Sequence, residues 1–102
     1  MNFNELACQV EEVVCNHIDA NLASMFQSTK KGDCVKARHL SIFVLHTLYH
    51  VPISWLSIRY KFSTRHIFRA VAQIRDYIRT NRQYRDLCES IRIDMETLTL
   101  TK

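Results

Sequence analysis

Residues 64–79 carry a helical pattern that constrains the fold of this chain more than any other feature of the sequence. Apolar residues recur there at intervals of three and four, at Ile67, Ala70, Val71, Ile74 and Ile78. This spacing is typical of a helix that buries one stripe. The opposite face carries Arg65, Arg69, Ala72 and Asp76. The segment is therefore predicted to form an amphipathic helix with a basic, solvated face.

A second, shorter helix is predicted just before this segment. Pro52 cannot donate a backbone hydrogen bond and restricts the residue before it, so a preceding helix is expected to end near His50. A new helix can begin at Ile53, and its side chains Leu56 and Tyr60 would face the core.

Residues 61–63 form the predicted turn between these two helices. Ser63 or Thr64 can accept hydrogen bonds from the first free amide groups and so start the second helix. Residues 53–79 thus match a helix-turn-helix whose second helix lies against DNA. The alternative is an ordinary two-helix corner of an all-helical core, which any small helical domain contains.

Length and composition indicate one all-α domain. The chain of 102 residues is long enough for one core but too short for two. It contains one Gly and one Pro, and no segment alternates as a sheet strand does. We therefore expect a single domain over residues 1–102, a bundle of five to six helices that contains the helix-turn-helix at about residues 53–79.

Charge is unevenly distributed along the chain. Residues 1–29 contain four acidic residues and no Lys or Arg, whereas residues 30–85 contain twelve Lys or Arg against two acidic residues. The basic residues therefore centre on the helix-turn-helix and the segment before it. Such a concentration is expected of a surface that binds phosphate groups.

Two helices and a loop are expected in the N-terminal third. The first helix spans about residues 3–15, with Asn4 as its cap. Its inward residues would be Leu6, Val10, Val13 and Val14, and its outward residues Glu5, Gln9, Glu11 and Glu12. Asp19 would cap a short second helix, and residues 27–33 would form a polar, basic loop.

Two further helices are expected on either side of the helix-turn-helix. Residues 34–50 are apolar on both sides, with one stripe formed by Ala37, Leu40, Val44, Leu48 and Val51. This helix is expected to be central, covered by the N-terminal helix and by the helix-turn-helix. Apolar residues between Tyr84 and Met95 predict a last helix that folds back on the core, and residues 97–102 are expected to fray.

Several classes of site and location are not expected. His46 and His50 have a spacing that can hold a metal, but they lack a third ligand, so no metal or other cofactor is expected. The cysteines form no C-x-x-C pair and the N-terminus does not resemble a signal peptide, which favours a reduced, cytoplasmic protein. No apolar run approaches the roughly 20 residues that span a bilayer, so no membrane association is expected.

The order of these segments resembles the C-terminal DNA-binding domain of the bacterial replication initiator DnaA, a Trp-repressor-like helical fold. The resemblance covers residues 5 to about 95: paired short helices, a basic loop, the segment V-K-A-R-H-L-S-I-F-V-L-H-T-L, the helix-turn-helix and a final helix. The D-H-T-T signature of the family is absent, and Ser63, Thr64, Arg65 and His66 stand in its place. No G-x-x-x-x-G-K-[ST] motif is present, so nucleotide binding is not expected and the chain looks like a stand-alone relative.

The resemblance implies DNA contacts outside the helix-turn-helix. Lys30 or Lys31 would match an arginine that enters the minor groove. Arg38 and His39, with Lys36 close by, would match residues that contact phosphates. From the residues themselves, the start of the second helix of the pair is expected to reach base edges in the major groove. The predicted DNA-binding residues are Lys30, Lys31, Lys36, Arg38, His39, Lys61, Ser63, Thr64, Arg65, His66 and Arg69.

Double-stranded DNA binding is therefore the expected function, and the resemblance implies a nucleoid-associated role in replication initiation or its regulation. Half-site proteins of this size often act in pairs, so a homodimer is a further expectation.

The alternative function is that of a dimerising or partner-binding module that kept the fold and lost sequence-specific DNA recognition. The acidic N-terminal helix and the apolar residues Phe43 and Trp55 suggest this alternative. Trp55 can also be explained as a residue that anchors the core. An enzyme is not expected, because no carboxylate or Cys-His pair has a spacing that places it in a pocket.

Overall fold

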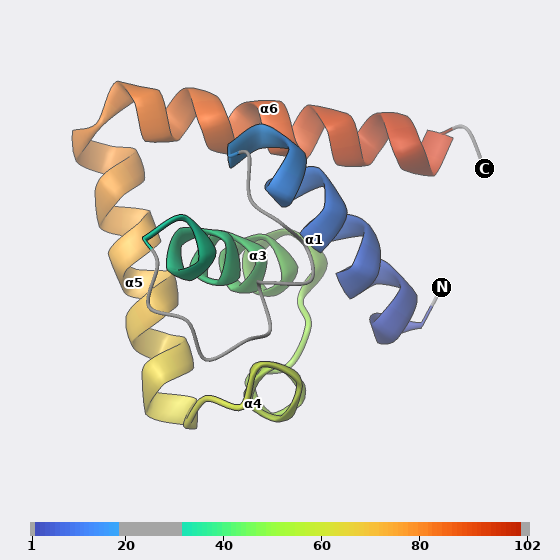
Figure 1. Ribbon diagram of the computed structural model, residues 1–102, viewed down its shortest axis with the longest axis vertical. Coiled ribbons are helices and arrows are strands. Elements are labelled where there is room, and N and C mark those ends of the chain that lie inside the picture. Colours follow the sequence, from blue (N-terminus) through green and yellow to red (C-terminus); the bar gives the residue numbers. More distant parts are fainter. Residues whose placement is uncertain (1, 19–31, 101–102) are drawn as a thin grey trace.

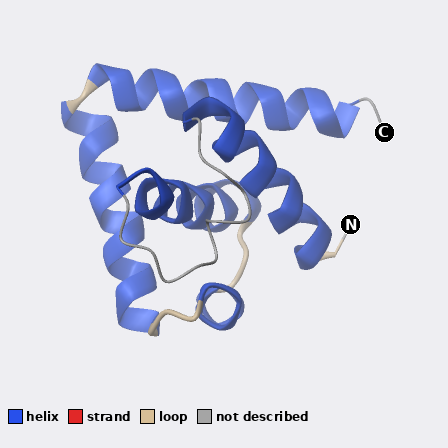
Figure 2. Ribbon diagram, in the orientation of Figure 1, coloured by secondary structure: helices blue, strands red, loops and turns tan. Residues whose placement is uncertain are grey.

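The computed structural model describes residues 2–18 and 32–100. This part of the chain forms five helices: α1 (Phe3–Ile18), α3 (Gly32–Tyr49), α4 (Ile53–Tyr60), α5 (Thr64–Thr80) and α6 (Arg82–Leu100) (Figure 1). No strand occurs within these described ranges (Figure 2). The prediction of an all-α bundle is confirmed.

One expected helix lies outside the described residues. The short helix that Asp19 would cap and the loop residues 27–31 fall there. The last two residues of the predicted loop, Gly32 and Asp33, belong to α3, which therefore starts two residues before the predicted residue 34.

α3 occupies the centre of the bundle, as the sequence predicts. α1 packs on one side of α3 and α5 on another, and α6 contacts both α1 and α5 (Figure 1). Leu40, Ile42 and Leu45 of α3 are fully buried. Leu48, expected to face inward, is instead 40% exposed. Because α3 is covered on more than one side, the apolar spacing by itself does not single out the stripe that is buried.

α1 starts at Phe3 as predicted, but its cap and its end differ from the prediction. The helix continues to Ile18, and its inward residues Leu6, Val10, Val13 and Val14 are buried as predicted. The cap is Asn2 rather than Asn4, because the Asn2 Oδ1 accepts a hydrogen bond from the Glu5 amide at 2.8 Å. The Asn4 Oδ1 instead accepts a hydrogen bond from the Arg59 Nη1 at 2.8 Å.

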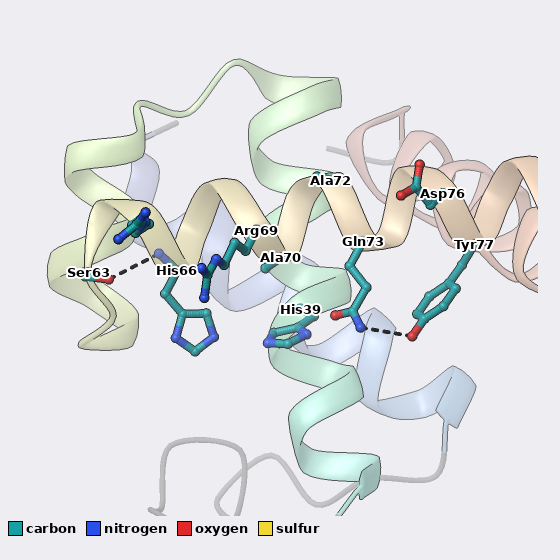
Figure 3. Close-up of a pocket in the computed structure, with 10 residues that line it drawn as sticks. His39, Ser63, His66, Arg69, Ala70, Ala72, Gln73, Asp76 and Tyr77 are labelled. Atoms are coloured by element: carbon teal, nitrogen blue, oxygen red, sulfur yellow. Dashed lines mark hydrogen bonds between the residues drawn. The ribbon is translucent and has the colours of Figure 1, made fainter.

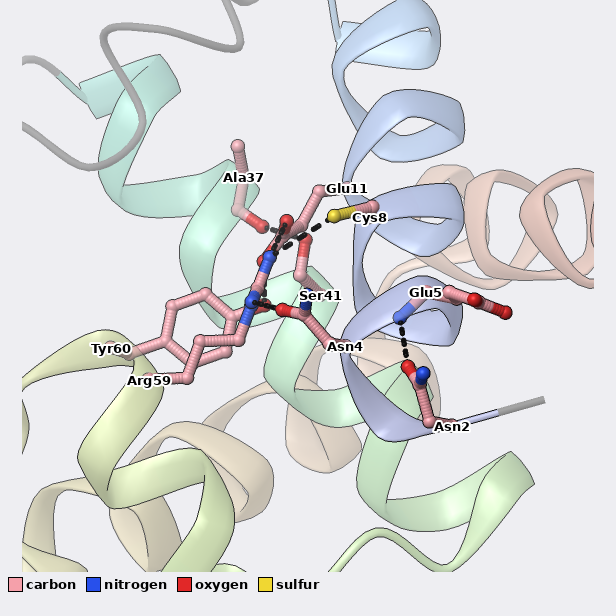
Figure 4. A network of polar contacts seen from close by, with 9 residues as sticks. All are labelled: Asn2, Asn4, Glu5, Cys8, Glu11, Ala37, Ser41, Arg59 and Tyr60. Atoms are coloured by element: carbon pink, nitrogen blue, oxygen red, sulfur yellow. Dashed lines mark hydrogen bonds and ion pairs between the residues drawn. The ribbon is translucent and has the colours of Figure 1, made fainter.

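The position of Glu11 differs most clearly from the prediction. Glu11 was expected to face solvent, but it is buried and only 1% exposed. Its carboxylate accepts hydrogen bonds from Arg59 at 2.6 Å through Nη2 and at 2.8 Å through Nε (Figure 4). The Tyr60 hydroxyl donates a third, at 2.5 Å. A buried carboxylate is tolerated when charged and polar donors surround it in this way. The cluster joins α1 to the end of α4.

α6 is longer than predicted. It begins after Asn81, whose Oδ1 accepts a hydrogen bond from the Gln83 amide at 2.9 Å, so the predicted break near residues 80 and 81 is confirmed. It continues to Leu100, so the prediction that fraying starts at Thr97 is wrong. α6 packs against α1, and just before this last part the His17 Nε2 lies 2.6 Å from the Asp94 Oδ2.

None of the described helices has both the length and the apolar character needed to cross a bilayer.

Candidate nucleic-acid interface

The entry to the helix-turn-helix follows the predicted boundaries. α3 ends at Tyr49, and α4 begins at Ile53, directly after Pro52. His50 adopts a left-handed conformation with φ of 57°. The Val51 amide donates to the Leu45 carbonyl at 3.1 Å, and His46 Nδ1 lies 3.1 Å from the Val51 carbonyl oxygen. These contacts end α3 and orient the connection that leads to α4.

The turn between α4 and α5 is closed by Ser57 and Phe62. The amides of Lys61 and Phe62 both donate to the Ser57 carbonyl, and the Ser57 hydroxyl donates to the Phe62 carbonyl at 2.5 Å. Lys61 itself is left-handed, with φ of 57° and ψ of 40°. Glycine usually occupies such a conformation, because a side chain adds steric cost there. The predicted turn at residues 61–63 is confirmed.

Ser63, rather than Thr64, caps α5. Its backbone is extended, with φ of −64° and ψ of 156°, and its Oγ accepts a hydrogen bond from the His66 amide at 3.1 Å. Behind the cap, the predicted stripe faces the core, since Ile67, Ala70, Val71 and Ile74 are buried and Ile78 is partly buried. The orientation of α5 therefore follows from its apolar stripe.

The first two turns of α5 present cations to solvent. Thr64, Arg65 and Arg69 are exposed, and Lys61 is exposed in the turn beside them. Within the described ranges, neither arginine has a hydrogen bond or an ion pair. Farther along the same face, Asp76 is also exposed and would repel phosphate. The face suited to an anion is therefore the N-terminal half of α5.

A groove between α3 and α5 continues from this face. Its lining includes His39 of α3 and Arg69, Gln73 and Tyr77 of α5 (Figure 3). The Gln73 Nε2 donates to the Tyr77 hydroxyl at 2.9 Å. The groove has a volume of about 760 Å³, and the exposed Arg65 also lines it.

Three rings connect α3, the turn and α5. Phe62 and His66 are stacked, with centroids 3.9 Å apart and planes 11° apart. His39 meets His66 and Phe62 edge-on, at centroid distances of 5.6 Å and 6.3 Å. Burial lowers the pKa of His39, and the neighbouring charges of His66 and Arg38 act in the same direction, whereas a hydrogen bond with Gln73 opposes them. The His39 side chain is therefore mainly neutral near pH 7, and it contributes ring contacts to the site more than positive charge.

Lys36 and Arg38, two of the predicted phosphate-contacting residues of α3, each lie near an aromatic ring. Lys36 Nζ is 4.8 Å from the centre of the Tyr84 ring of α6, and the Arg38 guanidinium is 6.0 Å from the centre of the Phe62 ring. Both side chains are partly buried. The structure thus places Arg38, His39 and His66 around Phe62. Lys36 lines a neighbouring pocket together with His39 and Tyr84. Lys30 and Lys31 lie outside the described residues.

Two exposed apolar residues are not among those predicted from the sequence. Phe68 is 60% exposed and Ile58 is 81% exposed. Phe68 follows Thr64 by four residues and precedes Ala72 by four, so its spacing could have placed it beside the basic face. The ring pair of Phe62 and His66 has the same spacing, but nothing in the sequence links it to His39.

The described residues also bear on metal and thiol chemistry. They contain no group of three or more His, Cys, Asp or Glu side chains placed to hold a metal ion. Burial raises the pKa of the Cys88 thiol to about 11, which disfavours a reactive thiolate at neutral pH.

Comparison with known proteins does not assign the chain to a family. No protein-family model matches it, and no curated protein matches it. The resemblance to the DnaA domain therefore rests on the layout of the sequence.

Proposed function

We propose that this chain binds double-stranded DNA through the helix-turn-helix of α4 and α5, as a relative of the DnaA DNA-binding domain. One observation carries the proposal most directly. The exposed arginines Arg65 and Arg69 stand one turn apart on α5, and their helix is held in place by a buried stripe and a capped N-terminus. A rigid helix that presents two free guanidinium groups is suited to the major groove.

The geometry of the turn supports the proposal. Three residues separate α4 from α5, and the Ser57 and Phe62 hydrogen bonds define their relative orientation. α5 therefore projects as one unit with α4, as a recognition helix does relative to the helix before it. Fixed orientation matters because a base edge accepts a hydrogen bond only over a narrow range of angles.

Different roles are proposed for the cations around this helix. Arg65 and Arg69 would reach guanine edges or nearby phosphates, while Lys61, Lys36 and Arg38 would contact the DNA backbone. His66, stacked on Phe62, would lie at the edge of the same face. Because the D-H-T-T signature is absent, we infer that the sequence read differs from that of the initiator family.

Selection from a random-sequence duplex pool tests this function. The chain is incubated with the pool near physiological salt, and bound duplexes are sequenced after several rounds. We expect an enriched motif, and we expect affinity to fall with rising salt by roughly one unit of logarithmic slope for each phosphate contact. Salt-sensitive binding without a motif would reduce the proposal to non-specific binding, and no binding would refute it.

One observation favours the alternative of a protein-interaction module. Ile58 on α4 is 81% exposed, and a large apolar side chain in such a position can join a protein interface. The other two residues that suggested this function, Phe43 and Trp55, pack partly against the core instead. Sedimentation equilibrium over a range of concentrations tests the alternative. Self-association that Ile58→Ser abolishes would support it, and a monomer in both proteins would oppose a dimeric module.

A further inference from the structure

The exposed surface of α5 includes one large apolar side chain among its cations. Phe68 is 60% exposed, although it lies on the helix proposed to face DNA. Thr64, Arg65, Phe68, Arg69 and Ala72 together line one shallow depression. The small side chain of Ala72 leaves space beside the ring, and the two arginines stand next to it.

The neighbours of Phe68 distinguish it from other exposed apolar residues. Isolated apolar side chains are common on protein surfaces and need no functional explanation. Phe68 differs because two guanidinium groups that attract phosphate border its depression. A DNA duplex drawn to Arg65 and Arg69 would bring its major-groove edge against the phenyl ring.

The major groove offers one apolar group that such a ring can contact. Among the four bases, only thymine presents a methyl group on its major-groove edge, and phenylalanine is one of the side chains that contact it. We propose that Phe68 is a specificity-determining residue that packs against the C5-methyl group of a thymine, with Ala72 making room for that base. The inference rests on the proposed function and adds to it the type of base that is read.

Deoxyuridine gives a direct test, because it pairs as thymine does and lacks only the methyl group. Each thymine in the duplex enriched by selection is replaced in turn by deoxyuridine, and the dissociation constant is measured by fluorescence anisotropy. For the wild-type chain we expect at least one replacement to weaken binding about fourfold, the factor that corresponds to one buried methyl group. The Phe68→Ala variant should bind the thymine and deoxyuridine duplexes equally at that position.

Two further variants separate this effect from general damage. Ile93→Ala removes another exposed apolar side chain, on α6 and outside the helix-turn-helix, and should keep the fourfold sensitivity. Phe68→Leu keeps an apolar group and should retain part of it. Circular dichroism melting checks that all three variants remain folded, which is expected because Phe68 and Ile93 are both largely solvent-exposed.

The outcomes distinguish this inference from the proposed function. An enriched motif whose thymines can all be replaced without loss, or a Phe68→Ala variant as sensitive as the wild type, would overturn the role of Phe68 and leave DNA binding intact. A motif without thymine would do the same. Salt-sensitive binding without an enriched motif would overturn the role of Phe68 and leave non-specific DNA binding, and a selection that recovers no bound duplex would overturn both.

Discussion

Glu11 of α1 and Arg59 of α4 form an ion pair of 2.6 Å between Oε1 and Nη2. The Glu11 side chain is 2% exposed and the Arg59 side chain 16%. The pair raises the pKa of the Arg59 guanidinium, chiefly through its hydrogen bonds to Glu11. Tyr60 completes the cluster, and burial, followed by the charge of Glu11, raises the pKa of its hydroxyl. The first helix of the helix-turn-helix is thus tied to the N-terminal helix by a buried polar contact (Figure 4).

Removal of the Glu11 carboxylate should strongly destabilise the fold. Glu11→Ala removes the carboxylate that accepts two hydrogen bonds from the largely buried Arg59 side chain, and breaking a buried ion pair in this way typically costs about 3 to 5 kcal/mol. Urea denaturation measures the free energy of unfolding. Glu12→Ala is the matched control, because Glu12 is exposed and its loss should change stability by at most about 0.5 kcal/mol. Equal losses in the two variants would contradict the importance of the buried pair.

Lys61→Gly should increase stability and decrease DNA affinity. Glycine relieves the left-handed strain at Lys61, offset partly by its freedom in the unfolded chain, so stability should rise by up to about 1 kcal/mol. The lost charge should lower the salt slope of DNA binding by about one. Lys61→Ala separates the two effects, since it loses the charge without relieving the strain. Equal stability of the Gly and Ala variants would argue against strain at this residue.

Ser63→Ala should weaken α5 at its start. The Ser63 Oγ accepts a hydrogen bond from the His66 amide. Loss of such a cap typically lowers the free energy of unfolding by about 1 kcal/mol. Thr64→Ala, one residue on, removes an exposed hydroxyl and should cost less than about 0.5 kcal/mol. Thermal melting of both variants provides the measurement. A larger loss for Thr64→Ala would show that the cap is assigned to the wrong residue.

His39 should make the fold sensitive to acid. Its pKa in the folded protein is lowered from the ordinary value of 6.5, mainly by burial. As pH falls below that value, the unfolded chain takes up a proton at this position before the folded chain does, so stability decreases. His39→Phe keeps an aromatic ring and removes the titration. Urea midpoints between about pH 7.5 and about pH 5 should fall more for the wild type than for the variant. If the urea midpoints of the wild type and the variant decreased equally, the acid sensitivity would come from groups other than His39.

Arg65 and Lys36 should differ in their effects on DNA binding. Arg65→Ala is expected to cost about 1 to 3 kcal/mol on the enriched duplex and to relax preference at one base pair. Lys36→Ala should weaken binding to all duplexes alike, because a phosphate contact carries no sequence information. Arg82→Ala on α6 controls for the loss of one exposed positive charge. Identical behaviour of the Arg65 and Lys36 variants across sequences would contradict the assigned roles.

The sequence alone determined the features that depend on neighbouring residues. The apolar spacing of residues 67–78 predicted which face of α5 is buried, Pro52 predicted the boundary between α3 and α4, and Ser63 was one of two predicted caps. These features could be predicted because helix periodicity, the missing N–H group of proline and capping all act within one or two turns.

Only the tertiary structure decided which polar and apolar residues meet across helices. Glu11 has the outward spacing of a surface residue, and it is buried because Arg59, 48 positions away, supplies donors from α4. His39 meets His66 because α3 and α5 cross at that point, and Leu48 stays exposed although its spacing matches the inward stripe. The physical reason is that burial depends on which helix covers a position, and the covering helix is brought there by packing of the whole core.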